Sequence, residues 1–433
     1  MQSRIFQILS NILTLILIIN TGIAAQDNWQ KLDSPTNELL RNLSAVDENY
    51  VWAAGPNGTI IRTTNGGNDW ETLNSGVTTA IYDIFFLNRN LGWAVTFPFE
   101  QPYFTGILKT TNGGDDWQID QYPEEFIQFR TIHFLDSLNG FIGGARIEKT
   151  SDGGETWHSV IVDSNAVSDY PVIRFKFFDD QLGFASGGSR DHAGVMWRTT
   201  DGGLNWTAES VSPDEVFDFH LKDSLNIVAL SGDPEYIFPT VLVKSTNAGA
   251  DWISTNLQHF IISWAIDFRT VNEAWSASGI NFLFSSDGGD NWSVKETPDN
   301  AAVFDIQFVN DTVGFACGQD GVLLKYTGSA VNVAVDPDLT INNFELYQNF
   351  PNPFNPVTTI KFKIPGQVLN DNLLIKLKVF DILGNEIAIL VDEEKSAGVY
   401  EVEFFPDNLS SGIYFYTLSA GNFIETKKMI LLR

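Results

Sequence analysis

The sequence predicts an all-β protein that combines a seven-bladed β-propeller with a small C-terminal β-sandwich of the immunoglobulin type. An eight-residue segment ending in Trp occurs six times, at intervals of about 40–50 residues, which is the spacing of four-stranded propeller blades. Short segments of alternating apolar and polar residues surround each copy. After residue 329 the composition changes to a polar stretch, a Pro-rich segment and further strand-like segments.

Residues 1–25 have the pattern of a secretory signal peptide. Arg4 supplies a positive start, ILSNILTLILII is a short apolar run, and TGIAA supplies small residues before Gln26. The run is shorter than a membrane-spanning helix needs, and a retained anchor is the alternative. We therefore expect export of the chain.

Charge and composition limit the kinds of partner, cofactor and cross-link that we expect. The net charge is −28, most of it before residue 331, which disfavours nucleic acid and anionic membranes. Cys317 is the single cysteine and lies in the sequence FACG, so we expect a buried strand residue and no disulfide framework. Five histidines, without a HExxH motif or a Cys/His cluster, predict no metal and no cofactor. Asp/Asn-rich calcium loops are the alternative.

The repeated octet describes a tight hairpin. Its pattern is S/T-x-D/N-x-G-x-x-W: an Asp or Asn can accept hydrogen bonds from the backbone, Gly can take a positive φ, and Trp can pack between sheets. This pattern is the Asp-box. Six copies with variable Asp or Asn cannot all be catalytic, so we predict structural hairpins between third and fourth strands. The copies occupy residues 63–70, 110–117, 150–157, 199–206, 245–252 and 285–292.

The ends of the array predict how the propeller closes. After the sixth box, residues 304–327 supply three strands and no further box. The missing strand occurs at the start, where NWQKLD with Trp29 matches the segments that follow the boxes. We therefore expect Trp29 to be buried and its strand to pair with residues 321–327, which removes exposed sheet edges. An open solenoid is the alternative.

With these motifs, residues 27–328 resemble the Asp-box propellers similar to the photosystem II assembly-factor family. The resemblance implies a propeller over residues 26–329. It is specific for the fold and not for an activity.

The C-terminal residues resemble a second family. The segments PNPFNPVTTIKF, VFDILGNEI, LSSGIYFYTLSAG and ETKKMILLR occur in order after a polar linker at 330–343. Residues 344–433 thus resemble the C-terminal sorting domain of type IX secretion cargo. The resemblance implies recognition by the outer-membrane translocon and the sorting-domain peptidase, with delivery to the outer cell surface or release. Its signature positions are Gly398, Gly412, Lys427 and Lys428; an ordinary carbohydrate-adhesion sandwich is the alternative.

One alignment column predicts a ligand site. Aligned on the Gly-aromatic element of each repeat, the first strands carry a mostly polar column ten positions earlier, and its residues are Asn42, Asp83, Thr131, Arg174, Asp218, Ala265 and Asp305. The preceding column holds Arg41, Tyr82, Arg130, Ile173, Phe217, Trp264 and Phe304. We predict that these residues meet at the channel mouth opposite the boxes, as a polar site ringed with aromatics. Alternatively, these polar side chains bind no ligand and only solvate a water-filled channel.

Three long loops join second to third strands on the same side, at 97–106, 186–195 and 231–240. Tyr103 and Tyr236 lie in two of them among carboxylates and would suit a sugar- or peptide-binding rim, although ordinary loop packing explains them as well. The candidate ligand-binding residues are therefore Asp83, Arg130, Arg174, Asp218, Asp305, Tyr103 and Tyr236, and no catalytic residue is assigned.

For function, we expect a non-enzymatic protein that binds a glycan or a surface protein. A sialidase is excluded, because the family's arginine triad is not recognisable and Arg41 is followed by Asn42 and Leu43 instead of the family's Ile-Pro. The alternative is a glycoside hydrolase that uses two carboxylates about 5–10 Å apart on the top face.

Overall fold

A computed structural model describes residues 28–97, 103–163, 167–233, 235–328, 344–355, 357–364, 373–382, 384–395, 398–406, 409–420 and 423–432. The chain divides into two compact units, Met1–Val331 and Asn332–Arg433. The predicted signal peptide and linker lie outside the described residues. No membrane-spanning helix occurs in the described part of the chain.

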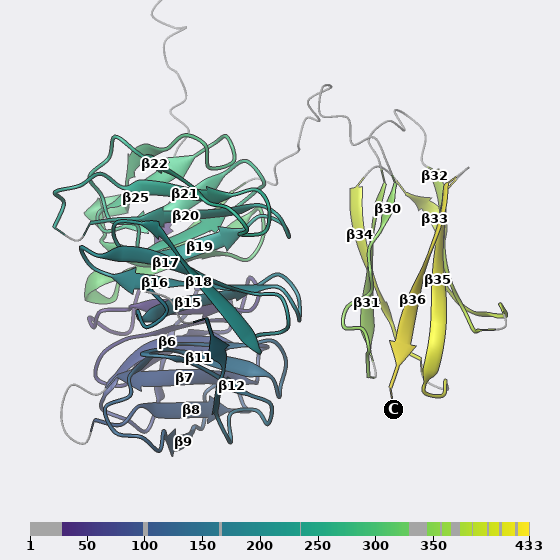
Figure 1. Cartoon of the computed structure of the whole chain (residues 1–433), viewed down its shortest axis with the longest axis horizontal. Coiled ribbons are helices and arrows are strands. Elements are labelled where there is room, and N and C mark those ends of the chain that lie inside the picture. The colour runs from purple at the N-terminus through teal and green to yellow at the C-terminus, as the bar shows by residue number, and fades with distance from the viewer. Residues whose placement is uncertain are drawn as a thin grey trace, which may run out of the picture. The chain divides into compact units, whose positions relative to one another are not determined.

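The first unit is built from β-sheets, with two 3₁₀ turns at Pro298–Asn300 and Gln319–Gly321 (Figure 1). Its described strands form seven sheets. The first sheet contains β2–β5 (Asn42–Ala45, Val51–Ala54, Thr59–Thr63, Glu71–Asn74), the second β6–β9 (Ala80–Phe86, Gly92–Phe97, Gly106–Thr110, Gln118–Gln121) and the third β10–β13 (Phe129–Phe134, Gly140–Gly144, Ile147–Thr150, His158–Ser159). The fourth contains β15–β18 (Val172–Phe177, Gly183–Ser189, Ala193–Thr199, Asn205–Ser212), the fifth β19–β22 (Val216–Leu221, Ile227–Ser231, Val241–Ser245, Ile253–Asn256) and the sixth β23–β26 (Ala265–Phe268, Ala274–Ser278, Asn281–Ser285, Ser293–Glu296). Neighbouring strands in these sheets are antiparallel, except that β14 (Ile161–Val162) joins β18 as a parallel fifth strand.

The seventh sheet joins the two ends of the unit. It contains β27 (Val303–Phe308), β28 (Val313–Gly318), β29 (Leu323–Thr327) and the N-terminal β1 (Trp29–Lys31). Trp29 lies opposite Tyr326, is 4% exposed and stacks on Phe282 with ring centroids 5.0 Å apart. The prediction that this strand is buried against residues 321–327 is confirmed. The unit is propeller-like, since the first strands of the sheets contact one another in the order β2, β6, β10, β15, β19, β23, β27 and back to β2.

The boxes form hairpins between third and fourth strands, as predicted. In the fourth box, Gly203 N–H donates to Thr199 Oγ1 at 2.9 Å and Asn205 N–H donates to Asp201 Oδ1 at 3.0 Å. The equivalent two bonds occur in all six boxes. Box carbonyls also bind the preceding sheet: Lys149 Nζ donates to Gly202 O at 2.6 Å. The boxes therefore stabilise single hairpins and join neighbouring sheets.

The second unit consists of two sheets over one apolar core. One sheet has the order β30 (Glu345–Leu346), β31 (Thr358–Ile364), β34 (Gly398–Phe404). The other has the order β33 (Glu386–Lys395), β32 (Leu373–Phe380), β35 (Gly412–Ala420), β36 (Phe423–Leu431). The immunoglobulin-like assignment stays a prediction.

The Pro-rich segment covers the edge of the last strand. Phe354 N–H donates to Ile430 O at 2.9 Å, and Leu432 N–H donates to Phe354 O at 3.0 Å. Asn352 Oδ1 accepts from Ile430 N–H at 2.8 Å. The edge of β36 is thus paired near its C-terminal end, which reduces the unpaired backbone available for aggregation.

Candidate functional site

The predicted site residues begin the first strand of each sheet, at the end away from the boxes. In the first sheet, Asn42 pairs with Ala54, and Ala54 pairs with Ile60 near the start of β4. The box begins at Thr63, the last residue of β4, so it lies at the opposite end of the sheet. The two aligned columns line two cavities, and each cavity is lined by residues at or just before the first strands of all seven sheets. We call the cavity away from the boxes the upper cavity and the one toward the boxes the lower cavity.

A backbone irregularity explains why two consecutive residues face the interior. Five first strands carry a register shift of one residue against the second strand, and the shifted residues are Tyr82, Arg130, Ile173, Phe217 and Phe304. A regular strand would send this side chain to the opposite face, but an extra bulged residue changes its direction. Glycine allows the close backbone crossing beside the bulge. A Cβ on Gly318 would lie 1.8 Å from Ala302 O.

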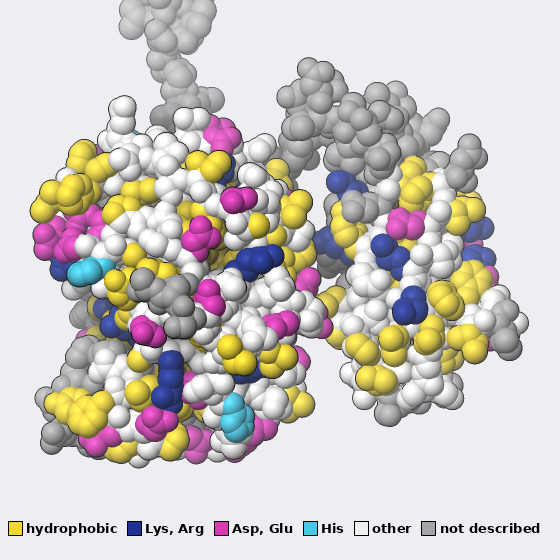
Figure 2. All heavy atoms as spheres, in the orientation of Figure 1, with side chains coloured by type: hydrophobic (Ala, Val, Ile, Leu, Met, Phe, Trp, Pro, Cys, Tyr) yellow, Lys and Arg dark blue, Asp and Glu magenta, His cyan; other side chains and the backbone are white. Residues whose placement is uncertain are grey.

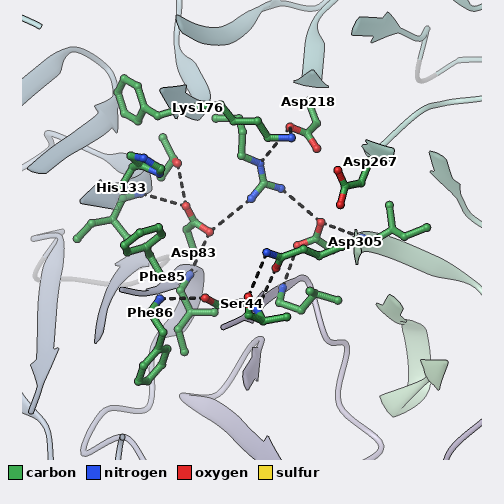
Figure 3. A pocket seen from close by; sticks show the side chains of 18 of the residues that line it. Ser44, Asp83, Phe85, Phe86, His133, Lys176, Asp218, Asp267 and Asp305 are labelled. Atoms are coloured by element: carbon green, nitrogen blue, oxygen red, sulfur yellow. Dashed lines mark hydrogen bonds and ion pairs between the residues drawn. The ribbon is translucent and has the colours of Figure 1, made fainter. Parts of the chain in front are cut away.

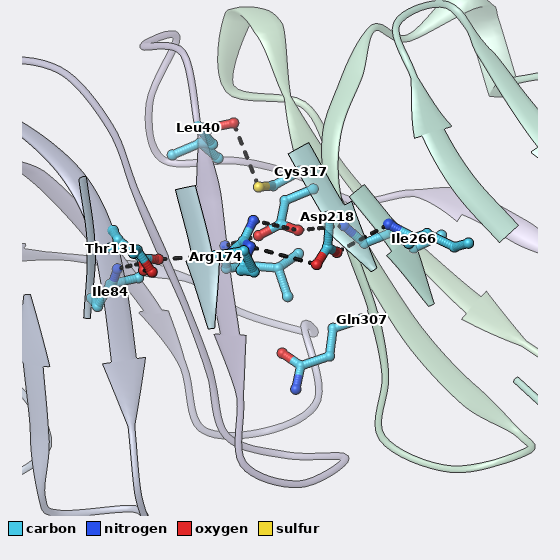
Figure 4. A network of polar contacts seen from close by, with 12 residues as sticks. Leu40, Ile84, Thr131, Arg174, Asp218, Ile266, Gln307 and Cys317 are labelled. Carbon is cyan, nitrogen blue, oxygen red and sulfur yellow. Dashed lines mark hydrogen bonds and ion pairs between the residues drawn. The ribbon is translucent and has the colours of Figure 1, made fainter. Parts of the chain in front are cut away.

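Arg174 is the centre of a buried ion-pair network (Figure 4). Its NH1, Nε and NH2 atoms lie 3.6, 3.7 and 3.8 Å from carboxylate oxygens of Asp83, Asp218 and Asp305. The amide of Asn42, oriented with its oxygen toward Arg174, accepts from NH1 at 3.1 Å and NH2 at 3.2 Å. The structure therefore brings together the four charged residues of the aligned column, and the Arg174 side chain is only 18% exposed.

The three carboxylates also connect neighbouring sheets. Asp83 Oδ2 accepts from Ile132 N–H at 3.0 Å, Asp218 Oδ2 from Ile266 N–H at 3.1 Å, and Asp305 Oδ2 from Leu43 N–H at 2.9 Å. In each case the donor belongs to the first strand of the next sheet. These first strands have no further strand on their inner edge, so their backbone N–H groups need other acceptors. The Asp residues thus have a structural role that the sequence did not reveal.

Burial dominates the titration of this network. It raises the pKa of Asp305 to about 6, with a further increase from Asp218 and Asp83 and a decrease from Arg174. Burial likewise raises the pKa of Asp83. For Arg174, burial lowers the pKa, but the three carboxylates raise it more, so the guanidinium keeps its proton.

The upper cavity has a volume of about 170 Å³ and is lined by ten residues, Leu39, Arg41, Asn42, Tyr82, Arg130, Ile173, Arg174, Phe217, Trp264 and Phe304. Arginines come from the first, third and fourth sheets, and the Arg41 guanidinium lies 4.7 Å from the centre of the Tyr82 ring. Apolar side chains come from the fourth to seventh sheets, with the Trp264 ring 4.8 Å from that of Phe217 and 5.7 Å from that of Phe304. The cavity therefore has a cationic side and an aromatic side.

The three Asp residues do not line the upper cavity, which corrects the predicted polar mouth. They line the lower cavity, with Arg174 reaching both. The carboxylates turn inward because they accept backbone hydrogen bonds from the neighbouring strands. The mouth itself is formed by the preceding, bulged column.

The lower cavity, of about 410 Å³, contains charged residues that sequence reasoning missed (Figure 3). Lys176 Nζ lies 2.9 Å from Asp218 Oδ1, and His220 Nδ1 lies 2.8 Å from Asp267 Oδ1. Burial lowers the pKa of His133 to about 4, and Lys176 and Arg174 add to this effect. Lys176, His220, Asp267 and His133 each follow the aligned column by two positions. The two-residue period of a strand could have identified them.

The predicted loop tyrosines lie outside both cavities. The Tyr103 ring packs 5.4 Å from that of Phe126. Tyr236 is 59% exposed. Hence the structure does not bring them together with the aligned column.

The loops also contain the acidic group that the calcium alternative would need. Asp191, Asp214 and Asp233 offer oxygens within 4.8 Å of one another. Asp214 Oδ1 accepts from Asp191 N–H at 2.9 Å, and Asp233 Oδ2 accepts from Ile237 N–H at 2.7 Å. The Asp214 and Asp233 carboxylates therefore already accept backbone hydrogen bonds. Elsewhere, Figure 2 shows acidic side chains spread over the surface of the first unit.

Comparison with known proteins finds matches to both units. Residues 262–327 match the family described as photosynthesis system II assembly factor YCF48, and residues 348–432 match the secretion system C-terminal sorting domain. The chain is 24% identical over 345 residues to the photosystem II assembly lipoprotein Ycf48 of Trichormus variabilis, covering 76% of this chain and 96% of that protein. The first unit is thus similar to Ycf48 proteins, and the C-terminal domain implies export and attachment at the cell surface.

Solved structures support the propeller fold. A structure described as YCF48 bound to D1 peptide has a TM-score of 0.55 at 21% identity, covering 70% of this chain and 97% of that chain. The GH74 xyloglucanase of Xanthomonas campestris has a TM-score of 0.51 at 11% identity, covering 77% of this chain and 59% of that chain. At such identities the likeness concerns the fold alone.

Proposed function

We propose that the first unit is a closed seven-bladed propeller that binds a ligand in its upper cavity without catalysing a reaction. The C-terminal domain carries it to the outer cell surface through the type IX translocon and the sorting-domain peptidase. The cyclic contacts of the seven first strands and the pairing of β1 with β29 support the closed ring.

One observation carries the binding role: the described residues that line the upper cavity include aromatic side chains and arginines but no carboxylate. None of its ten lining residues is Asp or Glu, in a chain that has 54 acidic and 26 basic residues. Apolar walls with a few oriented polar groups are typical of ligand sites.

A glycoside hydrolase is less well supported. Such an enzyme needs two carboxylates beside the sugar, and the upper cavity has none among its lining residues. In the lower cavity, Asp83, Asp218 and Asp305 are already held by backbone N–H groups and by Arg174. The fold likeness to a xyloglucanase therefore does not extend to a recognisable acid pair here.

The test is a binding screen of the full chain against arrays of glycans, peptides and outer-membrane proteins. We expect a ligand that wild type retains and Trp264→Ala loses, because Trp264 lies at the centre of the aromatic side. The control is Phe126→Ala, since Phe126 is exposed and lines neither cavity. A specific ligand whose binding is unaffected by Trp264→Ala would place recognition elsewhere and contradict the proposal.

A further inference from the structure

Building on the proposed function, we infer that the upper cavity recognises a carboxylate joined to a bulky apolar group. The free C-terminus of a peptide that ends in an aromatic or large aliphatic residue has this chemistry. A small N-acylated amino acid has it too.

The cationic side supplies the carboxylate contact. Arg41 and Arg130 come from different sheets and line the same cavity with Arg174 at its boundary with the lower cavity. Arg41 is held over the Tyr82 ring, so less side-chain freedom is lost when an anion binds. Guanidinium groups bind carboxylates through charge-assisted, often bidentate hydrogen bonds.

The aromatic side supplies the contact for the apolar group. Ile173, Phe217, Trp264 and Phe304 are all partly exposed and line the cavity, so their apolar surface is accessible to a ligand. Burying it against an apolar side chain is favourable by roughly 25 cal/mol per Å². A volume of about 170 Å³ limits the buried part of the ligand to about one large side chain with its carboxylate.

The network below the cavity favours a single negative charge. Asp83, Asp218 and Asp305 surround Arg174 at 3.6–3.8 Å. Their negative charge would repel a phosphate dianion more than a carboxylate. A quaternary ammonium ligand would suit the aromatic rings, but Arg41 and Arg130 would repel it.

The experiment measures affinity of the full chain by fluorescence anisotropy. The probe is a labelled hexapeptide ending in Phe, either with a free carboxylate or as the C-terminal amide. N-acetylphenylalanine and N-acetylphenylalanine amide serve as unlabelled competitors, with inorganic phosphate and choline as further competitors. We expect the amide to weaken binding at least about tenfold, as for loss of a hydrogen bond between charged groups. If N-acetylphenylalanine competes as well as the unlabelled peptide acid, the single residue is the recognised unit; if only the peptide competes, chain atoms beyond it contribute.

Variants assign the two sides. Arg41→Gln and Arg130→Gln should each weaken binding of the acid and leave that of the amide nearly unchanged, whereas Trp264→Ala should weaken both. Arg89→Gln, which alters an exposed arginine paired with Asp47, is the matched control. The acid–amide comparison on wild type needs no variant and stands if a variant misfolds.

The outcomes separate the two proposals. Equal affinity for acid and amide, sensitive to Trp264→Ala, overturns the carboxylate inference and leaves the binding site in place. Preferred competition by phosphate or choline, or no binding of any carboxylate probe, also overturns the inference. Only a ligand from the screen that binds without Trp264 contradicts the proposed function itself.

Discussion

Replacing Arg174 with Met tests the buried network most directly. Met fills a similar volume without charge, so the change leaves three carboxylates that had faced one cation at 3.6–3.8 Å. Removing one partner of a buried ion pair typically costs about 3–5 kcal/mol. We therefore expect the free energy of unfolding at pH 7 to fall by about 3–5 kcal/mol.

The loss should depend on pH. In wild type the pKa of Asp305 is already raised to about 6, and without Arg174 it rises further, so the folded variant binds more protons than the unfolded chain. Stability contributed by such a group increases as pH falls toward the unfolded pKa of about 4 and is lost as pH rises through the folded pKa. From pH 7 to pH 5 one such carboxylate stabilises the variant by about 2–3 kcal/mol and Asp305 stabilises wild type by about 1–1.5 kcal/mol, so the loss relative to wild type should shrink by about 1–1.5 kcal/mol.

Urea unfolding followed by Trp fluorescence measures this effect in the full chain. All 12 tryptophans lie between residues 29 and 292, so the signal reports the first unit. Arg41→Met is the control, because Arg41 is exposed and its removal should cost less than about 1 kcal/mol. If Arg174→Met does not fold at pH 7, recovery of folding at pH 5 meets the same expectation. A loss below about 1 kcal/mol at pH 7, or the same loss at both pH values, would refute the reasoning.

Three further outcomes are expected. Asp201→Ala should lower the free energy of unfolding by about 1–2 kcal/mol with ligand affinity unchanged. Because box hydrogen bonds hold the pKa of Asp201 to about 2, the difference should shrink in urea titrations as pH falls from about 4 toward 2; a binding defect without a stability change would contradict the structural role. Trp29→Ala should cost about 3–5 kcal/mol in the same assay, and full stability would argue against closure by β1. A reporter fused to residues 331–433 behind a signal peptide should become accessible to external protease in a type IX-competent host. Truncation from Phe423 should leave it in the periplasm, and surface delivery of the truncated fusion would refute the sorting role.

Features repeated along the chain were predictable from sequence. The boxes, the pairing of Trp29 with the last sheet and the convergence on Arg174 follow from residues that recur at fixed offsets. The sequence did not predict how deep along the channel each side chain lies. A bulge shifts the inward–outward alternation of side chains by one position, and the sequence gives no clear sign of it. Asp83 and Asp305 therefore lie below the mouth, while Tyr82 and Phe304 form it.

Other parts of the site lacked a usable pattern. Tyr103 and Tyr236 were chosen from loops, where no repeat constrains direction, and both lie away from the cavities. His220 and Asp267 follow the strand period but lie two positions after the polar column, beyond the two columns that the sequence pattern singled out.

The bulged column also affects how this protein can diverge. Each bulged side chain lies outside the hydrogen-bond register between first and second strands, so the pairing of the strands does not depend on its identity. One residue per repeat can therefore be exchanged while the hairpins and the Arg174 network continue to hold the scaffold. Paralogues with the same boxes could acquire different ligands through substitutions at a handful of codons.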